Sequence, residues 1–117
     1  MTAVPSGAAA AAAGGAAARA AASAQKFTFG FLIFEPEEFL KLVKTARETD
    51  GRAVVILVKK RKGVVNRKDE YIYAAKYADF TILTRSETPL ALPSKTELIV
   101  SRDIVLPVAV MHALKML

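Results

Sequence analysis

The chain of 117 residues contains no cysteine and no tryptophan, and its only histidine is His112. The lack of cysteine excludes disulfides, thiolate metal sites and a cysteine nucleophile, and it fits a reducing compartment such as the cytoplasm. We find no spaced set of carboxylates for a metal, no phosphate-binding glycine loop and no Ser-His-Asp arrangement. We therefore expect a non-enzymatic protein without cofactor or metal.

The sequence also lacks any run of 18 strongly apolar residues, so it predicts no transmembrane helix and no membrane partner. Its 17 Lys and Arg outnumber its 11 Asp and Glu, which gives a net charge of +6. This excess is clustered, and a clustered positive charge favours an anionic partner such as nucleic acid. A mildly basic surface without a dedicated partner is the alternative.

The first 25 residues are rich in Ala and differ from the rest of the chain. Gly14 and Gly15 interrupt any helix, and no apolar stripe is available for burial, so we interpret residues 1–25 as a disordered low-complexity arm. The segment has no positive n-region typical of a secretory signal. Because no acidic residue precedes Glu35, an organellar transit peptide remains an alternative. Residues 26–117 are expected to form a single domain.

A helix is the clearest element that the sequence predicts. Residues 35–51 begin with acidic residues and Pro36 and end at Gly51, which are start and stop signals of helices. One apolar face follows the spacing i, i+3, i+4, i+7, and it consists of Phe39, Leu42, Val43 and Ala46.

Most of the other segments are rich in β-branched and aromatic residues and predict strands. Residues 70–87 also contain helix formers, but the alternation of their tyrosines favours a hairpin that turns near Ala78 and Asp79. Pro107 can start a helix that runs to the end of the chain. The strands are expected at 26–34, 52–60, 70–77, 80–86 and 96–106. The order β-α-β-β-β-β-α predicts an α+β fold, with a small, largely antiparallel sheet and one or two helices on one face.

The segment KKRKGVVNRK, residues 59–68, carries six cations in ten positions. On a hairpin loop these side chains would project from one end of the sheet and could neutralise phosphates. Lysines that protect a strand edge, or a solvated charged loop, are the alternative. The candidate nucleic-acid-binding residues are Lys59, Lys60, Arg61, Lys62, Arg67 and Lys68, with Lys76 and Arg85 as extensions on neighbouring strands.

Two apolar features allow both a structural and a functional interpretation. Tyr71, Tyr73 and Tyr77 alternate on one predicted strand, where they would form the core or stack on unpaired bases. Residues 104–117 carry little charge and must pack on the chain's own sheet, on a second copy or on a protein partner. The candidate docking residues in this segment are Val108, Val110, Met111 and Leu114.

Residues 37–85 resemble two families of RNA-associated proteins. The succession EEFLKLVKTARETDG, VVILVKK, a basic turn and KYADFTILT is similar to small large-subunit ribosomal proteins of the L thirty-eight type from eukaryotes and archaea. The stretch GRAVVILVKK is also similar to the Alu-domain subunits of the signal recognition particle. The chain departs from both families in its extra first strand and in TPLALPSK, which stands where they continue into a helix. The resemblance implies that this plan binds structured RNA and that Lys59, Lys60, Arg61, Lys62 and Lys76 would touch phosphate.

We therefore expect a component of a ribonucleoprotein, ribosome-like, that contacts the phosphate backbone of structured RNA through a basic hairpin loop. The alternative is a small structural subunit that dimerises or docks on a protein through its apolar C-terminus.

Overall fold

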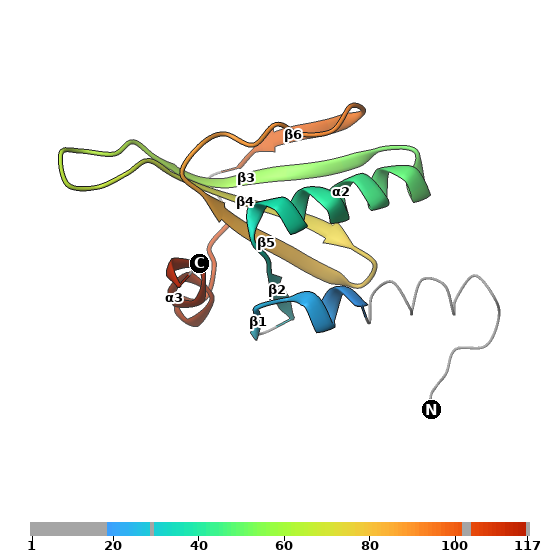
Figure 1. Ribbon diagram of the computed structural model, residues 1–117, viewed down its shortest axis with the longest axis horizontal. Coiled ribbons are helices and arrows are strands. Elements are labelled where there is room, and N and C mark those ends of the chain that lie inside the picture. The colour runs from blue at the N-terminus through green and yellow to red at the C-terminus, as the bar shows by residue number, and fades with distance from the viewer. Residues whose placement is uncertain (1–18, 29, 102–103, 117) are drawn as a thin grey trace.

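The computed structural model describes residues 19–28, 30–101 and 104–116. Within these residues, one six-stranded sheet is accompanied by two main helices (Figure 1). A short helical segment at 19–23 precedes them. The elements are β1 (Lys26–Thr28), β2 (Phe31–Ile33), α2 (Pro36–Asp50), β3 (Ala53–Arg61), β4 (Glu70–Tyr77), β5 (Phe80–Ser86), β6 (Thr96–Val100) and α3 (Val108–Lys115).

The strand order of the sheet is β1-β2-β5-β4-β3-β6. The β3–β4, β4–β5 and β1–β2 pairs are antiparallel, whereas β2 pairs with β5 and β6 pairs with β3 in parallel. The fold is therefore α+β with a mostly antiparallel sheet, as expected. The parallel pairs lie to either side of the central β5-β4-β3 meander, and β6 forms one edge of the sheet.

Helix α2 confirms the helix predicted over 35–51. Pro36 occupies its first turn, Glu37 and Glu38 lie near its positive end, and Gly51 caps it with φ 83° while donating its N–H to the Arg47 carbonyl. The apolar face buries Phe39, Leu42 and Val43 against the sheet. This face anchors α2 across β3, β4 and β5 (Figure 1).

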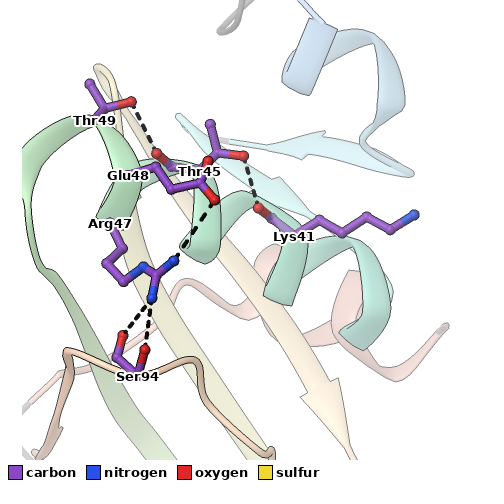
Figure 2. Close-up of polar contacts among 6 residues, drawn as sticks. All are labelled: Lys41, Thr45, Arg47, Glu48, Thr49 and Ser94. Atoms are coloured by element: carbon purple, nitrogen blue, oxygen red, sulfur yellow. Dashed lines mark hydrogen bonds and ion pairs between the residues drawn. The ribbon is translucent and has the colours of Figure 1, made fainter.

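The connection between β5 and β6 is tied to α2 and to the sheet. Arg47 Nη1 donates to both the hydroxyl and the carbonyl oxygen of Ser94, at 2.8 Å and 3.3 Å (Figure 2). The N–H of Leu90 donates to the hydroxyl of Tyr73 at 3.2 Å. These contacts fix the proline-containing crossover that brings β6 alongside β3.

The two faces of the sheet carry separate apolar clusters. One includes Phe39 of α2, Val55 and Tyr73, and the other includes Val110 of α3, Ile72 and Leu83. The two helices therefore cover opposite faces of the sheet. The expectation that the helices lie on one face holds for α2, whereas α3 covers the other face. The sequence periodicity did not indicate which face of the sheet α3 covers, because β2, β4 and β5 are apolar on both faces.

The strand expected over 26–34 is a short hairpin, β1 and β2, because Gly30 adopts φ 81° in the connection. The hairpin preferred for 70–87 is confirmed, with its turn at Ala78, which has φ 52°. Residues 1–18 of the predicted arm lie outside the described residues. The remainder of that arm is not wholly separate from the fold, because Ala20 is buried in the cluster under α2.

Candidate nucleic-acid interface

The β3–β4 connection, residues 62–69, forms an arm that extends beyond the sheet (Figure 1). Val64 and Arg67 exchange two backbone hydrogen bonds of 2.8 Å and 2.9 Å and close a tight turn at the tip. The side chains of Lys62, Arg67 and Lys68 are exposed along the arm. At the tip, Val65 is 99% exposed. The arm thus combines cations along its length with an uncovered apolar tip.

Gly63 and Asp69 hold the base of the arm together. The Asp69 carboxylate accepts a hydrogen bond from the Gly63 N–H. A Cβ atom at position 63 would overlap the backbone of Arg67 and Lys68, so only glycine allows the two sides of the arm to approach this closely. The arm therefore has a defined shape, which lowers the entropy lost when it meets a partner.

A β-bulge at Val58 determines where the cations of β3 point. Leu57 pairs with Tyr73 and Lys59 with Ile72, so Val58 is an extra residue on β3. A bulge shifts the side-chain alternation by one position. The shift places Lys59 on the same face as Ile72 and Val58, which belong to the α3-side cluster. A regular strand would have directed Lys59 and Arg61 toward the α2 side.

Lys59 and Arg61, which the bulge turns to the α3 side, both point toward Glu70. Its side chain is only 1% exposed, and Arg85 donates its Nε–H to Glu70 Oε2 at 2.6 Å. Glu70 Oε1 lies 3.3 Å from Lys59 Nζ and 3.6 Å from Arg61 Nη1, as ion pairs. The register explains the convergence, since Arg61 is paired with Glu70 and Arg85 with Ile72. We call Lys59, Arg61, Glu70 and Arg85 the Glu70 cluster.

The charge of Glu70 is stabilised despite its burial. Desolvation raises the pKa of this carboxyl, but the hydrogen bond from Arg85 and the charges of Lys59 and Arg61 outweigh it, so the pKa lies below its ordinary value. Glu70 is therefore ionised at neutral pH and balances one of three cations. Two positive charges of the cluster remain uncompensated within it.

The structure brings most of the predicted nucleic-acid-binding residues to one end of the sheet. Lys60 is exposed at the end of β3, on the face opposite the Glu70 cluster, and the arm cations follow directly. Lys68 also forms an exposed ion pair with Glu87 at 3.4 Å, which water and salt weaken. Lys76 lies six residues from Glu70 along β4, about 20 Å away at the spacing of a β-strand, and is not part of this group.

The three tyrosines of β4 lie on the α2 side of the sheet. Tyr73 and Tyr77 are 3% and 7% exposed within the cluster under α2, and Tyr71 packs against that cluster. Their burial matches the core interpretation, and it leaves Tyr73 and Tyr77 no open ring face on which a base could stack.

The candidate docking residues of α3 divide into two groups. Val110 and Leu114 are fully buried on the chain's own sheet, and Met111 packs against the same cluster. They serve the core because the apolar row of α3 faces β5, β2 and β1. Val108 alone is largely exposed. Of the expected docking segment 104–117, Leu117 lies outside the described residues.

Sequence reasoning missed Glu70. The signal was present, since Glu70, Ile72 and Ala74 occupy one row of β4, and a carboxylate on an apolar row requires a buried cationic partner.

The fold and this surface define a small α+β domain with a projecting basic arm. Comparisons with family models, curated proteins and solved structures found no match. Within the described residues no helix is long and apolar enough to cross a membrane. In the same residues, no three His, Asp or Glu side chains gather in a group that could hold a metal.

Proposed function

We propose that the protein is a non-enzymatic RNA-binding component of a ribonucleoprotein and that it contacts phosphates with the arm. The observation that carries the proposal is the projection of Lys62, Arg67 and Lys68 beyond the sheet on a preorganised hairpin, with Lys60 at its base. Only Asp69 offsets these charges within the arm, and it is engaged with Gly63. Exposed cations on a projecting element can approach phosphates on two sides, which a flat surface cannot do.

The tip supports structured RNA as the partner. Val64 and Val65 are 63% and 99% exposed, so they can pack against unpaired bases of an RNA loop while the neighbouring cations contact its phosphates. Neither valine carries a hydrogen-bonding side chain that could read a base. Asn66 is the one exposed carboxamide in this turn, so the arm is expected to recognise mainly the shape and backbone of RNA, with Asn66 as its single candidate for a base contact.

Replacing Lys60, Lys62, Arg67 and Lys68 with Gln is expected to weaken binding to a fluorescent RNA stem-loop at least tenfold at about 100 mM salt. Fluorescence anisotropy gives the affinity. All four side chains are exposed and lie outside the Glu70 cluster, so the variant should fold.

The matched control replaces Lys41, Lys44, Lys76 and Lys115 with Gln, which removes the same charge from exposed positions elsewhere. It should retain most of the affinity. Equal losses in both variants would mean that net charge alone drives binding, and the assignment to the arm would be wrong.

A second candidate function, self-association, is favoured by strand β6. Leu98, Ile99 and Val100 are 46%, 41% and 63% exposed on this edge strand, and no Lys, Arg or Pro protects it between 96 and 101. Antiparallel pairing of β6 with its copy would place Leu98 opposite itself and cover the apolar residues of both chains. The partner in this second candidate function is therefore a second copy of the chain. The two copies would pair through β6 and not through α3.

Sedimentation tests the self-association directly. The protein should sediment as a dimer at about 100 μM, in the micromolar affinity range of small interfaces, and Ile99→Lys should sediment as a monomer because a lysine blocks strand addition. Val65→Lys, at the exposed arm tip, adds the same charge and should leave the dimer intact. A monomeric wild-type protein, or a dimer that tolerates Ile99→Lys, would exclude this candidate.

A further inference from the structure

Three cations surround the single buried carboxylate of Glu70. Arg85 alone supplies a hydrogen bond of 2.6 Å, and Lys59 adds an ion pair at 3.3 Å. Arg61 brings a third charge at 3.6 Å without an aligned hydrogen bond. Gathering like charges costs free energy unless something offsets it. Glu70 Oε1 meets Lys59 and Arg61 only as ion pairs, and neither this oxygen nor the Nε of Arg61 has a hydrogen-bond partner among the described residues. One carboxylate cannot balance three cations, so the excess positive charge points to a second anion.

The exposure of the cations gives the direction from which that anion would come. Glu70 is covered, but the side chains of Lys59, Arg61 and Arg85 remain 37%, 30% and 25% exposed. Arg85 uses its Nε–H for Glu70, and among the described residues its side chain has no other hydrogen bond. Its terminal NH2 groups can therefore serve a ligand on the solvent side. Glu70 would orient the cations from beneath while the ligand contacts them from above.

The chemistry of the cluster fits a phosphate group. Two guanidinium groups and a lysine provide the donors that phosphate oxygens prefer, and the uncompensated positive charge of the cluster exceeds the single negative charge of a backbone phosphate. The cluster lies where the arm begins, because Arg61 and Glu70 are the last paired residues before residues 62–69. An RNA strand held by the arm would thus bring a backbone phosphate within reach of the cluster.

We propose that Lys59, Arg61 and Arg85, positioned by buried Glu70, form a discrete binding site for one phosphate group. The proposal deepens the proposed function and rests on it for the source of the phosphate, which is the RNA backbone rather than free phosphate. It assigns two roles to the basic stretch: the arm cations supply general attraction, and the cluster fixes the position of one phosphate.

The test is an NMR titration of the arginine Nε–H signals with inorganic phosphate, against sodium chloride at equal ionic strength. The signals of Arg61 and Arg85 should shift in a saturable manner at millimolar phosphate. The signals of Arg52 and Arg67, which lie outside the cluster, should change only as they do with chloride. Lys59→Gln should weaken phosphate binding about tenfold, whereas Lys62→Gln, which removes an equal charge from the arm, should change it less than twofold. Lys59→Gln leaves Glu70 two cationic partners, so the fold should be retained.

A second titration with the RNA stem-loop identifies the source. RNA at micromolar concentration should reproduce the shifts of Arg61 and Arg85. Shifts of Arg67 with unchanged Arg61 and Arg85 would overturn the phosphate site and leave RNA binding by the arm intact. Saturable phosphate binding without any response to RNA would overturn the RNA backbone as the source and, with it, the proposed function. Uniform phosphate shifts across all four arginines would reduce the cluster to a structural ion pair network.

Discussion

Glu70→Gln is expected to lower the free energy of unfolding by about 2–3 kcal/mol at pH 7, because it removes a buried charged hydrogen bond while leaving three partly exposed cations that water can solvate. The substitution keeps the size of the side chain but leaves Lys59, Arg61 and Arg85 without their shared anion. A domain of this size is stable by only about 5–15 kcal/mol. The variant should therefore lose a substantial fraction of its stability and unfold at a clearly lower urea concentration.

Urea denaturation at pH 7 measures this loss. Glu87→Gln is the matched control, because the Glu87 carboxylate is 55% exposed and pairs with exposed Lys68. This control should change the stability by less than about 0.5 kcal/mol. A loss below about 1 kcal/mol for Glu70→Gln would show that the cluster does not depend on its buried charge.

The pH dependence has a defined sign. The pKa of Glu70 is lower in the folded protein than its ordinary value of 4.5. In the unfolded chain Glu70 therefore binds its proton more readily, and its contribution to stability is present above that ordinary value. The contribution is lost as the pH falls through the lower folded pKa. The difference between wild type and Glu70→Gln should accordingly shrink below about pH 4.

RNA affinity of the wild-type protein is expected to fall at least about 50-fold between 50 and 200 mM salt. This figure assumes that the arm neutralises four phosphates. For single strands, each neutralised phosphate lowers the logarithm of the binding constant by about 0.7 for each unit of the logarithm of the salt concentration. Binding through Val64 and Val65 alone would show almost no such dependence. Anisotropy titrations at four salt concentrations provide the slope, and a fall of less than about fivefold would contradict phosphate contacts.

The arm variant, with Gln at positions 60, 62, 67 and 68, leaves Lys59 and Arg61 unchanged because both belong to the Glu70 cluster. Lys59 and Arg61 belong to the same basic stretch as Lys60 and Lys62, yet they hold a buried carboxylate. Replacing the whole stretch would combine lost binding with lost stability. Lys60, Lys62, Arg67 and Lys68 can be changed without disturbing Glu70, so their effect on affinity reports on contact with RNA.

Much of the architecture was predictable because local signals agreed with the tertiary structure. The start and stop residues of α2 and the alternation in β4 and β5 identified these elements correctly. The face chosen by α3 could not be predicted, because strands buried on both sides offer two apolar surfaces. The division at Gly30 was also missed, since glycine within an apolar run is consistent with a bulge as well as with a turn.

The candidate site was predictable in composition but not in geometry. Residue types alone placed six cations near a turn. The bulge at Val58 has no sequence signature, and it decides that Lys59 and Arg61 face Glu70 and Arg85 while Lys60 faces the other side. Long-range register likewise placed Lys76 far from the arm. Glu70, the charged residue in the apolar row of β4, was the only sequence signal that could have predicted the cluster.

The central claim is that the arm contacts RNA phosphates, and the salt slope of the arm variant tests it most directly. Gln at positions 60, 62, 67 and 68 should reduce the slope by about 0.7 for each cation removed. The charge-matched control at 41, 44, 76 and 115 should keep the wild-type slope. An arm variant whose slope equals that of wild type would contradict the account.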